Sequence, residues 1–293
     1  MNNGELNGKQ VPILSELEDY VSGLEKFEGE FVPVYYSYGA LDRALELSSL
    51  ADKSYQFLKE FFKTDIEIAT LVLNLGDWEK RNKEYPYGAV FAGRGCVHFP
   101  SDIDTPFIQA VMPLYDHCPQ NLKASLTSLM GYEDKAFRHA CQRLIDLLMV
   151  HEMTHAFADK ERVLFGQNWF SEVFPQYTEY AFLKRHEDEN SRDLRIFEIV
   201  LDIFYEGGKP LIKYRSLEDF ETLYFGVGPL NYCWYQGKFV KGVIELYRKY
   251  GESFIDRVIE TFRVTEDSVV WKLDASCEGF HKWFNEWKKE SEQ

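Results

Sequence analysis

From Pro100 onward the chain keeps one pattern: apolar side chains recur every three or four residues with few interruptions. This spacing places them on one face of an α-helix. Gly207-Gly208-Lys209-Pro210 and residues 226–229 are breaks in the pattern. The larger part of the protein must therefore bury its core between packed helices. We predict helices at about 105–116, 121–130, 134–158, 169–186, 191–206, 217–224, 231–249, 252–262 and 277–289.

The pattern before Pro100 is different. Residues 1–12 are polar and predict a mobile tail, whereas apolar spacing predicts helices over residues 14–27 and 41–62. Residues 66–75 are rich in aliphatic side chains and partly alternate, which indicates a strand. Residues 76–88 are polar and predict a turn region.

A hairpin is predicted next. Ala89-Val90-Phe91-Ala92 and Cys96-Val97-His98-Phe99 flank Gly93-Arg94-Gly95, whose glycines suit a tight turn. The chain thus predicts an α+β fold that is mainly helical. A small antiparallel or mixed sheet in residues 1–104 would lie over a helical part, residues 105–293, with a cleft between them.

Composition narrows the class of protein. The chain is 45% hydrophobic and 16% aromatic, which is ample for a core, and its net charge is −15. Such a charge repels phosphate, so it argues against nucleic acid and against anionic membrane surfaces as partners.

The cellular compartment can be inferred from the hydropathy and the cysteines, although these are weaker signals. No apolar run approaches the roughly 18 residues of a membrane span, and the first residues lack a signal-peptide core. The five cysteines are odd in number and show no CxxC spacing, which indicates buried, reduced thiols rather than a disulfide framework. A cytoplasmic location is the expectation.

The most specific motif lies in residues 137–160. Its inward apolar stripe is extended by His151 and His155, which are one helical turn apart and can bind one metal ion. Glu152 is offset by about 100° from His151, so it stands beside the ion and can take a proton from metal-bound water. The alternative is a pair of core histidines, each of which would need polar partners.

A catalytic zinc site needs a third protein ligand and an open position. The metzincin pattern fails, because Ala158 and Glu161 stand where that pattern has glycine and histidine. Glu172 is the better candidate, since it opens the next predicted helix and two antiparallel helices would bring it back over the histidines. Glu161 or Glu179 as ligand, or Glu172 as an ordinary first-turn residue, are the alternatives. Pro175 places Glu172 near the helix start.

Here the chain resembles the gluzincin metallopeptidases, which pair HExxH with a glutamate on the next helix, in some members within Trp-x-x-Glu. Trp169-Phe170-Ser171-Glu172 is similar to that element. The spacing from His155 to Glu172 is shorter than in the thermolysin and aminopeptidase N families, which argues against membership in either. The resemblance implies a zincin-like fold that acts as one catalytic unit.

The resemblance also implies a substrate-binding edge strand above the active-site helix, at Ala89, Val90, Phe91 and Ala92, where a peptide adds as a further strand. It implies a tyrosine that donates to the oxyanion of the tetrahedral intermediate. Tyr235 is the first candidate and Tyr232 the second.

Some polar residues are expected to orient the histidines from behind. Gln176 and Asp159 are candidates, each one turn after a predicted ligand. The remaining histidines have no ligand spacing and are expected to be surface or hydrogen-bonded core residues: His98, His117, His139, His186 and His281.

The leading hypothesis is a zinc peptidase. Zinc is held by His151, His155 and Glu172, and Glu152 acts as base and then as acid on a peptide or protein substrate. One alternative is a non-catalytic zincin-like protein that uses the cleft to bind peptides or proteins. Another is a helical scaffold with a coincidental motif.

Overall fold

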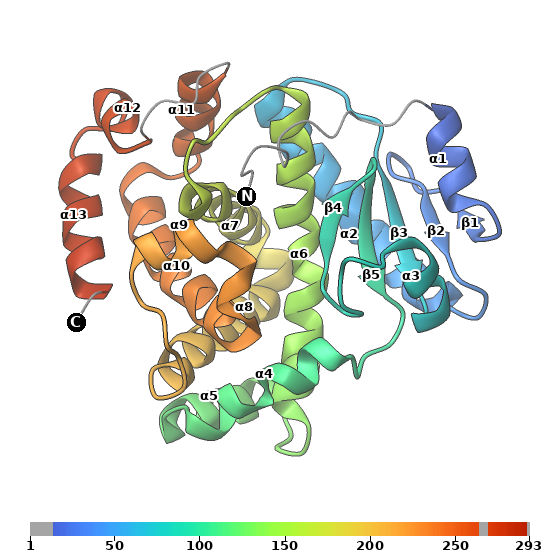
Figure 1. Cartoon of the computed structure of the whole chain (residues 1–293), viewed down its shortest axis with the longest axis horizontal. Coiled ribbons are helices and arrows are strands. Elements are labelled where there is room, and N and C mark those ends of the chain that lie inside the picture. The colour runs from blue at the N-terminus through green and yellow to red at the C-terminus, as the bar shows by residue number, and fades with distance from the viewer. Residues whose placement is uncertain (1–13, 264–268, 292–293) are drawn as a thin grey trace.

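A computed structural model describes residues 14–263 and 269–291, so the predicted tail at residues 1–12 lies outside the described part. The N-terminal region forms a small mixed sheet, and helices dominate the remainder (Figure 1). The strands are β1 (Glu25–Phe27), β2 (Val34–Tyr36), β3 (Ala69–Leu73), β4 (Phe91–Gly93) and β5 (Cys96–Pro100). The helices are α1 (Leu14–Val21), α2 (Leu41–Phe62), α3 (Leu75–Arg81), α4 (Pro106–His117), α5 (Gln120–Met130), α6 (Ala136–Lys160), α7 (Asn168–Arg185), α8 (Glu187–Gly208), α9 (Leu217–Leu223), α10 (Pro229–Tyr250), α11 (Ser253–Phe262), α12 (Val269–Ser276) and α13 (Phe280–Ser291), with a 3₁₀ turn η1 (Tyr224–Val227).

The sheet has the order β1-β2-β3-β5-β4. Strands β2, β3 and β5 are parallel, while β1 and β4 run antiparallel at the two edges. Every residue of β3 is buried, because α2 and α6 cover one face of the sheet while α1 and α3 cover the other. A central parallel strand buried on both faces needs a continuous aliphatic run, which is what residues 66–75 supplied.

Helix α6 lies at the centre of the molecule. It lies between the sheet side and the helical side, and it packs on α2, α7 and α8 (Figure 1). One large hydrophobic core includes residues from both predicted parts, from Val34 in β2 to Trp287 in α13. The two parts therefore share a core, and any side chain at their junction is held from both sides.

Helices α8 and α10 approach each other closely at Gly237. A Cβ atom on Gly237 would lie 2.4 Å from the Leu201 carbonyl oxygen, well inside van der Waals contact. The missing side chain therefore lets α10 lie against α8, and it also packs on α7. This packing carries the first turns of α10, with Tyr232 and Gln236, to the side of α7.

Several predicted boundaries were wrong for local reasons. The helix predicted over residues 14–27 ends at Val21, and Gly23 with φ of +81° turns the chain into β1. The polar segment 76–88 contains α3, whose first turn is capped by the Asn74 side chain. The helix predicted at 277–289 is α13, which begins only at Phe280 after Gly279 with φ of +75°, and the preceding helix α12 was not predicted.

The predicted hairpin forms, with a shorter first strand. Ala89 and Val90 precede β4, whose residues are Phe91, Ala92 and Gly93. Arg94 and Gly95 both have positive φ, at +54° and +70°, as a two-residue type I′ turn requires. Strand β4 is the edge of the sheet next to α6.

His98 ties β5 to the edge strand. Its ring is fully buried and stacks on Phe91, with centroids 4.3 Å apart. The Asn82 amide donates to Nδ1 at 3.1 Å, and Nε2 donates to the Gly93 carbonyl at 3.2 Å. His98 is thus a buried, neutral histidine whose two ring nitrogens both have hydrogen-bond partners, as expected from its lack of ligand spacing.

Acid should destabilise the fold through His98. Burial lowers the pKa of His98 from 6.5 to about 4, so the unfolded chain takes up a proton that the folded chain refuses. Its contribution is present above pH 6.5 and is lost as the pH falls toward 4, by about 3 kcal/mol in the free energy of unfolding. Urea unfolding of the wild type and of His98→Gln between pH 7.5 and 4.5 measures this, and equal pH slopes for the two proteins would contradict it.

Candidate metal centre

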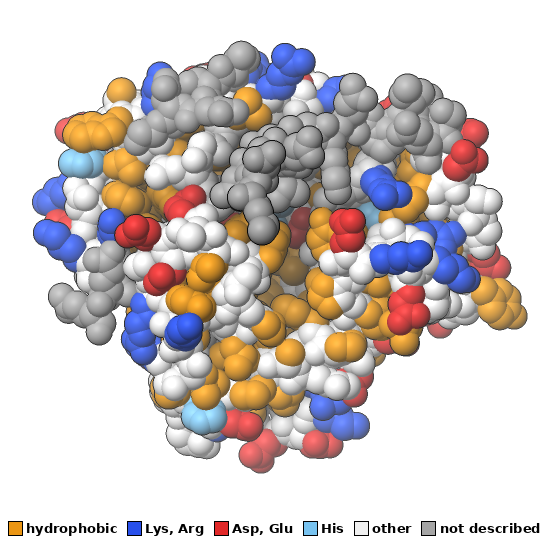
Figure 2. All heavy atoms as spheres, viewed as in Figure 1, with side chains coloured by type: hydrophobic (Ala, Val, Ile, Leu, Met, Phe, Trp, Pro, Cys, Tyr) orange, Lys and Arg blue, Asp and Glu red, His pale blue; other side chains and the backbone are white. Residues whose placement is uncertain are grey.

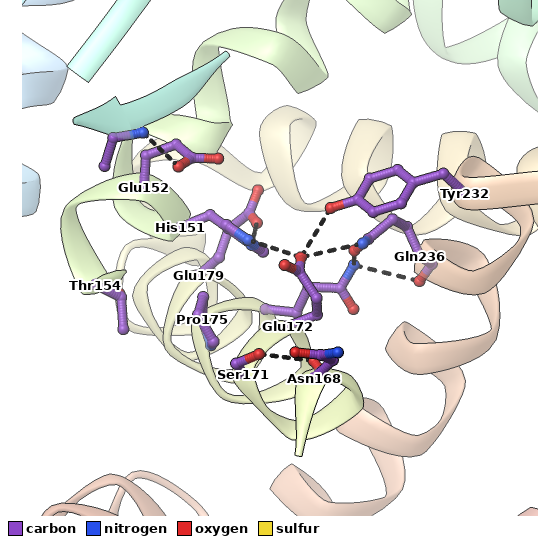
Figure 3. A network of polar contacts seen from close by, with 12 residues as sticks. His151, Glu152, Thr154, Asn168, Ser171, Glu172, Pro175, Glu179, Tyr232 and Gln236 are labelled. Atoms are coloured by element: carbon purple, nitrogen blue, oxygen red, sulfur yellow. Dashed lines mark hydrogen bonds and ion pairs between the residues drawn. The ribbon is translucent and has the colours of Figure 1, made fainter. Parts of the chain in front are cut away.

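Helices α6 and α7 cross where their polar side chains meet (Figure 3). Thr154 of α6 and Thr178 of α7 share a hydrogen bond of 2.6 Å between their hydroxyl oxygens, and both side chains are fully buried. Small hydroxyl side chains let the two helices come close. The residues of the site lie within two turns of this contact on each helix.

His151, His155 and Glu172 are brought together at this crossing. One ligand atom from each lies within 4.8 Å of the other two, and no other such group of His, Cys, Asp and Glu occurs in residues 14–263 and 269–291. His151 is 4% exposed and Glu172 2%, whereas His155 is half-buried. The predicted ligand set therefore converges on one point that could hold a metal ion.

Glu172 sits deeper in its helix than expected. Helix α7 begins at Asn168, so Glu172 is in its second turn and Pro175 is inside the helix rather than at its start. The Glu221 carboxylate of α9 accepts the Asn168 and Trp169 N–H groups, at 2.9 and 2.7 Å, which satisfies the first donors of the helix. Glu172 is thus not a first-turn residue that serves the helix terminus.

The Glu172 carboxylate is held by three donors from the C-terminal half of the chain. Tyr224 of η1 donates to Oε1, while Tyr232 and Gln236 of α10 donate to Oε2, at 2.9 and 3.2 Å. Hydrogen bonds to a charged group contribute about 1.5–3 kcal/mol each, which offsets much of the cost of burying this carboxylate. Oε2 also lies 3.5 Å from Nε2 of His151.

Glu179 stands behind His151. It is 1% exposed, and its Oε2 lies 3.8 Å from Nδ1 of His151, on the side of the ring away from Glu172 (Figure 3). Neither that nitrogen nor the Glu179 oxygens have a hydrogen bond in the described part of the chain. A carboxylate facing the second nitrogen of a histidine is the usual support of a metal ligand, because it fixes the tautomer and the ring orientation.

Glu152 points from α6 to the edge strand. Its Oε2 accepts the Ala92 N–H of β4 at 2.8 Å, and its side chain is half-buried (Figure 3). Phe91 and Ala92 of the predicted substrate strand are therefore next to the motif. Ala89 and Val90 lie before the strand begins.

Interactions between the charged groups raise the pKa of His151 and lower the pKa values of His155 and Glu172. Burial alone would lower the pKa of His151, but the Glu172 hydrogen bond and the neighbouring carboxylates raise it to about 9. Burial and the His151 charge lower the pKa of His155 to about 4. Burial favours the neutral acid in Glu172, yet its contacts with His151 bring its pKa down to about 2.

The two other carboxylates behave differently. Burial raises the pKa of Glu152 to about 7 and that of Glu179 to about 8. The charged forms of His151 and Glu172 therefore favour each other, with Nε2 of His151 3.5 Å from Oε2 of Glu172.

Tyr235, the first candidate for the oxyanion residue, is not in the cluster. Its hydroxyl donates to the Ser216 carbonyl at 2.7 Å, and its ring packs on Phe220. Tyr232 lies three residues earlier on α10, and its hydroxyl is the one that reaches Glu172. The spacing of the two tyrosines from Gly237 did not indicate which of them contacts Glu172.

The expected supporting residues were also wrong. Gln176 donates to Gln236 at 2.5 Å rather than to a histidine, so it holds the amide that contacts Glu172. Asp159 is exposed on the last turn of α6. Glu161 pairs with Arg263 at 2.9 Å and is not a ligand.

Three residues at the site were missed or given another role: Tyr224, Gln236 and Glu179. Glu179 had a usable signal, since it follows Glu172 by two helical turns and so lies on the same face of α7. Tyr224 had none: the helix predicted over 217–224 ends at Leu223, and nothing in the apolar spacing indicates the 3₁₀ turn or the φ of +46° with which Tyr224 begins it.

Comparisons with known protein families, with curated proteins and with solved structures give no match to this chain. No helix in the described residues is both long and apolar enough for a membrane crossing.

Metal content tests the cluster directly. We expect about one zinc per chain after incubation with zinc and removal of the excess, because three converging ligands suffice for a stable site. His151→Ala and Glu172→Ala should each reduce zinc binding at least tenfold, whereas His117→Ala, on the exposed end of α4, should not change it. Elemental analysis of the folded proteins measures this. A folded wild type that takes up no zinc would eliminate the metal centre.

Proposed function

We propose that this protein is a zinc-dependent peptidase of the gluzincin type. The observation that carries the proposal is the convergence of His151, His155 and Glu172, with Glu152 between that cluster and the edge strand β4. Two imidazoles, one carboxylate and a neighbouring free carboxylate are the donor set and base of a metallohydrolase.

The residues fit a zinc ion. Nitrogen and carboxylate oxygen are its ordinary ligands, and His151 presents Nε2 toward Glu172 while Nδ1 faces Glu179. The unsatisfied Glu179 carboxylate is explained if it orients His151 for metal binding. A bound zinc ion supplies a Lewis acid and lowers the pKa of a coordinated water.

Glu152 is the proposed base. It is on the same helix as both histidines, it is partly exposed, and it accepts a hydrogen bond from a backbone N–H of the edge strand. A carboxylate there can accept a proton from the attacking water and pass it to the leaving amine. A substrate carbonyl that takes the Ala92 N–H would free Glu152 for that role.

A peptide is the proposed substrate because the edge strand offers backbone groups. Gly93 and Cys96 flank the two-residue turn and pair with each other, so the Ala92 N–H and C=O point away from β5. The observed bond from Ala92 to Glu152 agrees with that direction. An extended peptide could therefore add to β4 directly over the cluster.

The surrounding surface suits such a ligand. Figure 2 shows this face hollowed near its centre, with hydrophobic side chains bordering the hollow between the sheet side and the helical side. The mixed sheet with its antiparallel edge beside α6 supports the zincin-like arrangement that the sequence resemblance implies.

Tyr232 is the proposed oxyanion donor in place of Tyr235. It donates to Oε2 of Glu172, which is the oxygen nearer to His151, whereas Tyr224 holds Oε1. If this oxygen held a metal ion, the Tyr232 hydroxyl would be released from it and could donate to a substrate oxygen at the site. Burial and the Glu172 charge hold the pKa of Tyr232 well above its usual value, so it remains a donor at neutral pH.

Glu152→Gln separates catalysis from metal binding. We expect Glu152-dependent cleavage in a peptide library by the zinc-loaded wild type, and a loss of at least about 100-fold in kcat for Glu152→Gln with unchanged zinc content. Glu260→Gln, an exposed glutamate on α11, is the matched control and should retain activity. Zinc binding without any Glu152-dependent cleavage would favour a binding protein instead.

Tyr232→Phe and Tyr235→Phe form a matched pair. The first should lower kcat by about 100-fold with little change in KM, because an oxyanion donor acts in the transition state. The second removes a hydroxyl bonded to Ser216 and should lower stability rather than kcat. Steady-state kinetics on the best library peptide, with zinc content measured in parallel, decides between them. Equal losses of kcat would refute the assignment.

A further inference from the structure

A groove of about 610 Å³ runs beside the edge strand. Its walls come from α1, from the C-terminal end of α3 with the loop that follows it, and from β4 through the turn residue Arg94. It includes Phe91, Ala92 and Gly93, so it shares its strand wall with the position where Glu152 contacts Ala92. A peptide on β4 would therefore continue into this groove.

The groove is basic in an acidic protein. Lys80, Lys83 and Arg94 line it together with Arg81, against two carboxylates, Asp19 and Glu84, whereas the whole chain carries −15. Figure 2 shows lysine and arginine side chains gathered over this side of the molecule, where Figure 1 places α3. A local excess of positive charge on such a chain attracts a negatively charged group.

Arg81 is a structural residue. Its guanidinium donates to the Tyr20 and Ser22 carbonyls, at 3.0 and 2.7 Å, and pairs with Asp77 at 3.3 Å. Lys80 also pairs with Asp77, at 3.1 Å. Within residues 14–263 and 269–291, Lys83 and Arg94 have no carboxylate at ion-pair distance.

Arg94 is the best-placed cation. Its guanidinium lies over the Tyr20 ring, 5.0 Å from the centroid, which holds it at the groove. It occupies a position of positive φ where asparagine or glycine would form the turn at lower cost. Turn formation therefore does not require an arginine here, and the exposed Arg94 side chain lies at the groove where a ligand could meet it.

The distance along the strand sets the position of that ligand. Arg94 follows Ala92 by two residues, which is about 7 Å in an extended chain. A side chain two or three residues from the cleaved bond would therefore reach Arg94 and Lys83.

We propose that this groove binds the acidic side chain of an aspartate or glutamate in an extended peptide substrate, two or three residues from the bond that is cleaved. This inference rests on the proposed peptidase function. A guanidinium pairs with a carboxylate through two parallel hydrogen bonds, and the lysine adds a second charge. The two carboxylates in the groove and the acidity of the chain oppose a polyanion, so a single acidic residue in a peptide fits better than nucleic acid.

A randomised peptide library is the first test, with the zinc-loaded protein and with three variants. Arg94→Asn removes the charge at a position where asparagine tolerates positive φ, and Arg94→Asn/Lys83→Gln removes both charges. Lys282→Gln, exposed on α13 on the opposite side of the molecule, is the control. We expect at least about tenfold enrichment of Asp or Glu at one position in the wild type and the control, and near-equal use of Asp and Asn in the double variant.

Cleavage without an acidic preference, or a preference that survives in the double variant, overturns the inference and leaves the peptidase function intact. If no peptide is cleaved, the peptidase function fails, and binding decides the groove separately. For that arm the probes are two fluorescein-labelled decapeptides that differ only by a central Glu-Glu or Gln-Gln pair. Tighter binding of the Glu-Glu peptide to the wild type, lost in the double variant and weakened by salt, supports the groove, and equal binding of both refutes it.

Discussion

The buried carboxylate of Glu172 is the point on which this structure depends. A lone carboxylate in the interior is costly, and here it is balanced by His151 on α6 and by hydroxyl and amide donors on η1 and α10. Two distant parts of the chain, α6 with α7 and η1 with α10, must therefore take up fixed positions around one side chain. Gly237 permits the necessary approach of α10, and the threonine pair permits that of α6 and α7.

The same arrangement couples the helical side to the sheet. Helix α6 carries His151 toward the buried carboxylate and Glu152, the next residue, toward Ala92 of β4. His98 and Asn82 hold that edge strand from behind. The position of the proposed base is thus set by the sheet, while the proposed metal ligands are set by the helical core. The junction between the sheet side and the helical side therefore receives chemical groups from both.

Most helices could be predicted from the sequence, because apolar spacing indicates which face of each helix is buried. Helix α2 begins and ends at the predicted residues, and β3 is a strand within the predicted run. The short strands β1 and β2 were missed, since three residues are too few for a period to be visible. The histidines were found from spacing within one helix, and Glu172 from the expectation that the next helix runs back. Tyr232 and Tyr235 could not be separated, because which of the two hydroxyls reaches Glu172 depends on how α10 packs against α7.

The sequence by itself determined the helical character of the chain, the inward placement of His151 and His155, and the position of Glu152 beside them. Each of these follows from the geometry of a single helix. Only the tertiary structure decided that Glu172 joins them, that Glu179 stands behind His151, that Tyr224 and Tyr232 hold the carboxylate, and that Arg94 lies in a groove beside β4. These are contacts between distant segments. They depend on how closely elements approach each other, which local periodicity does not encode.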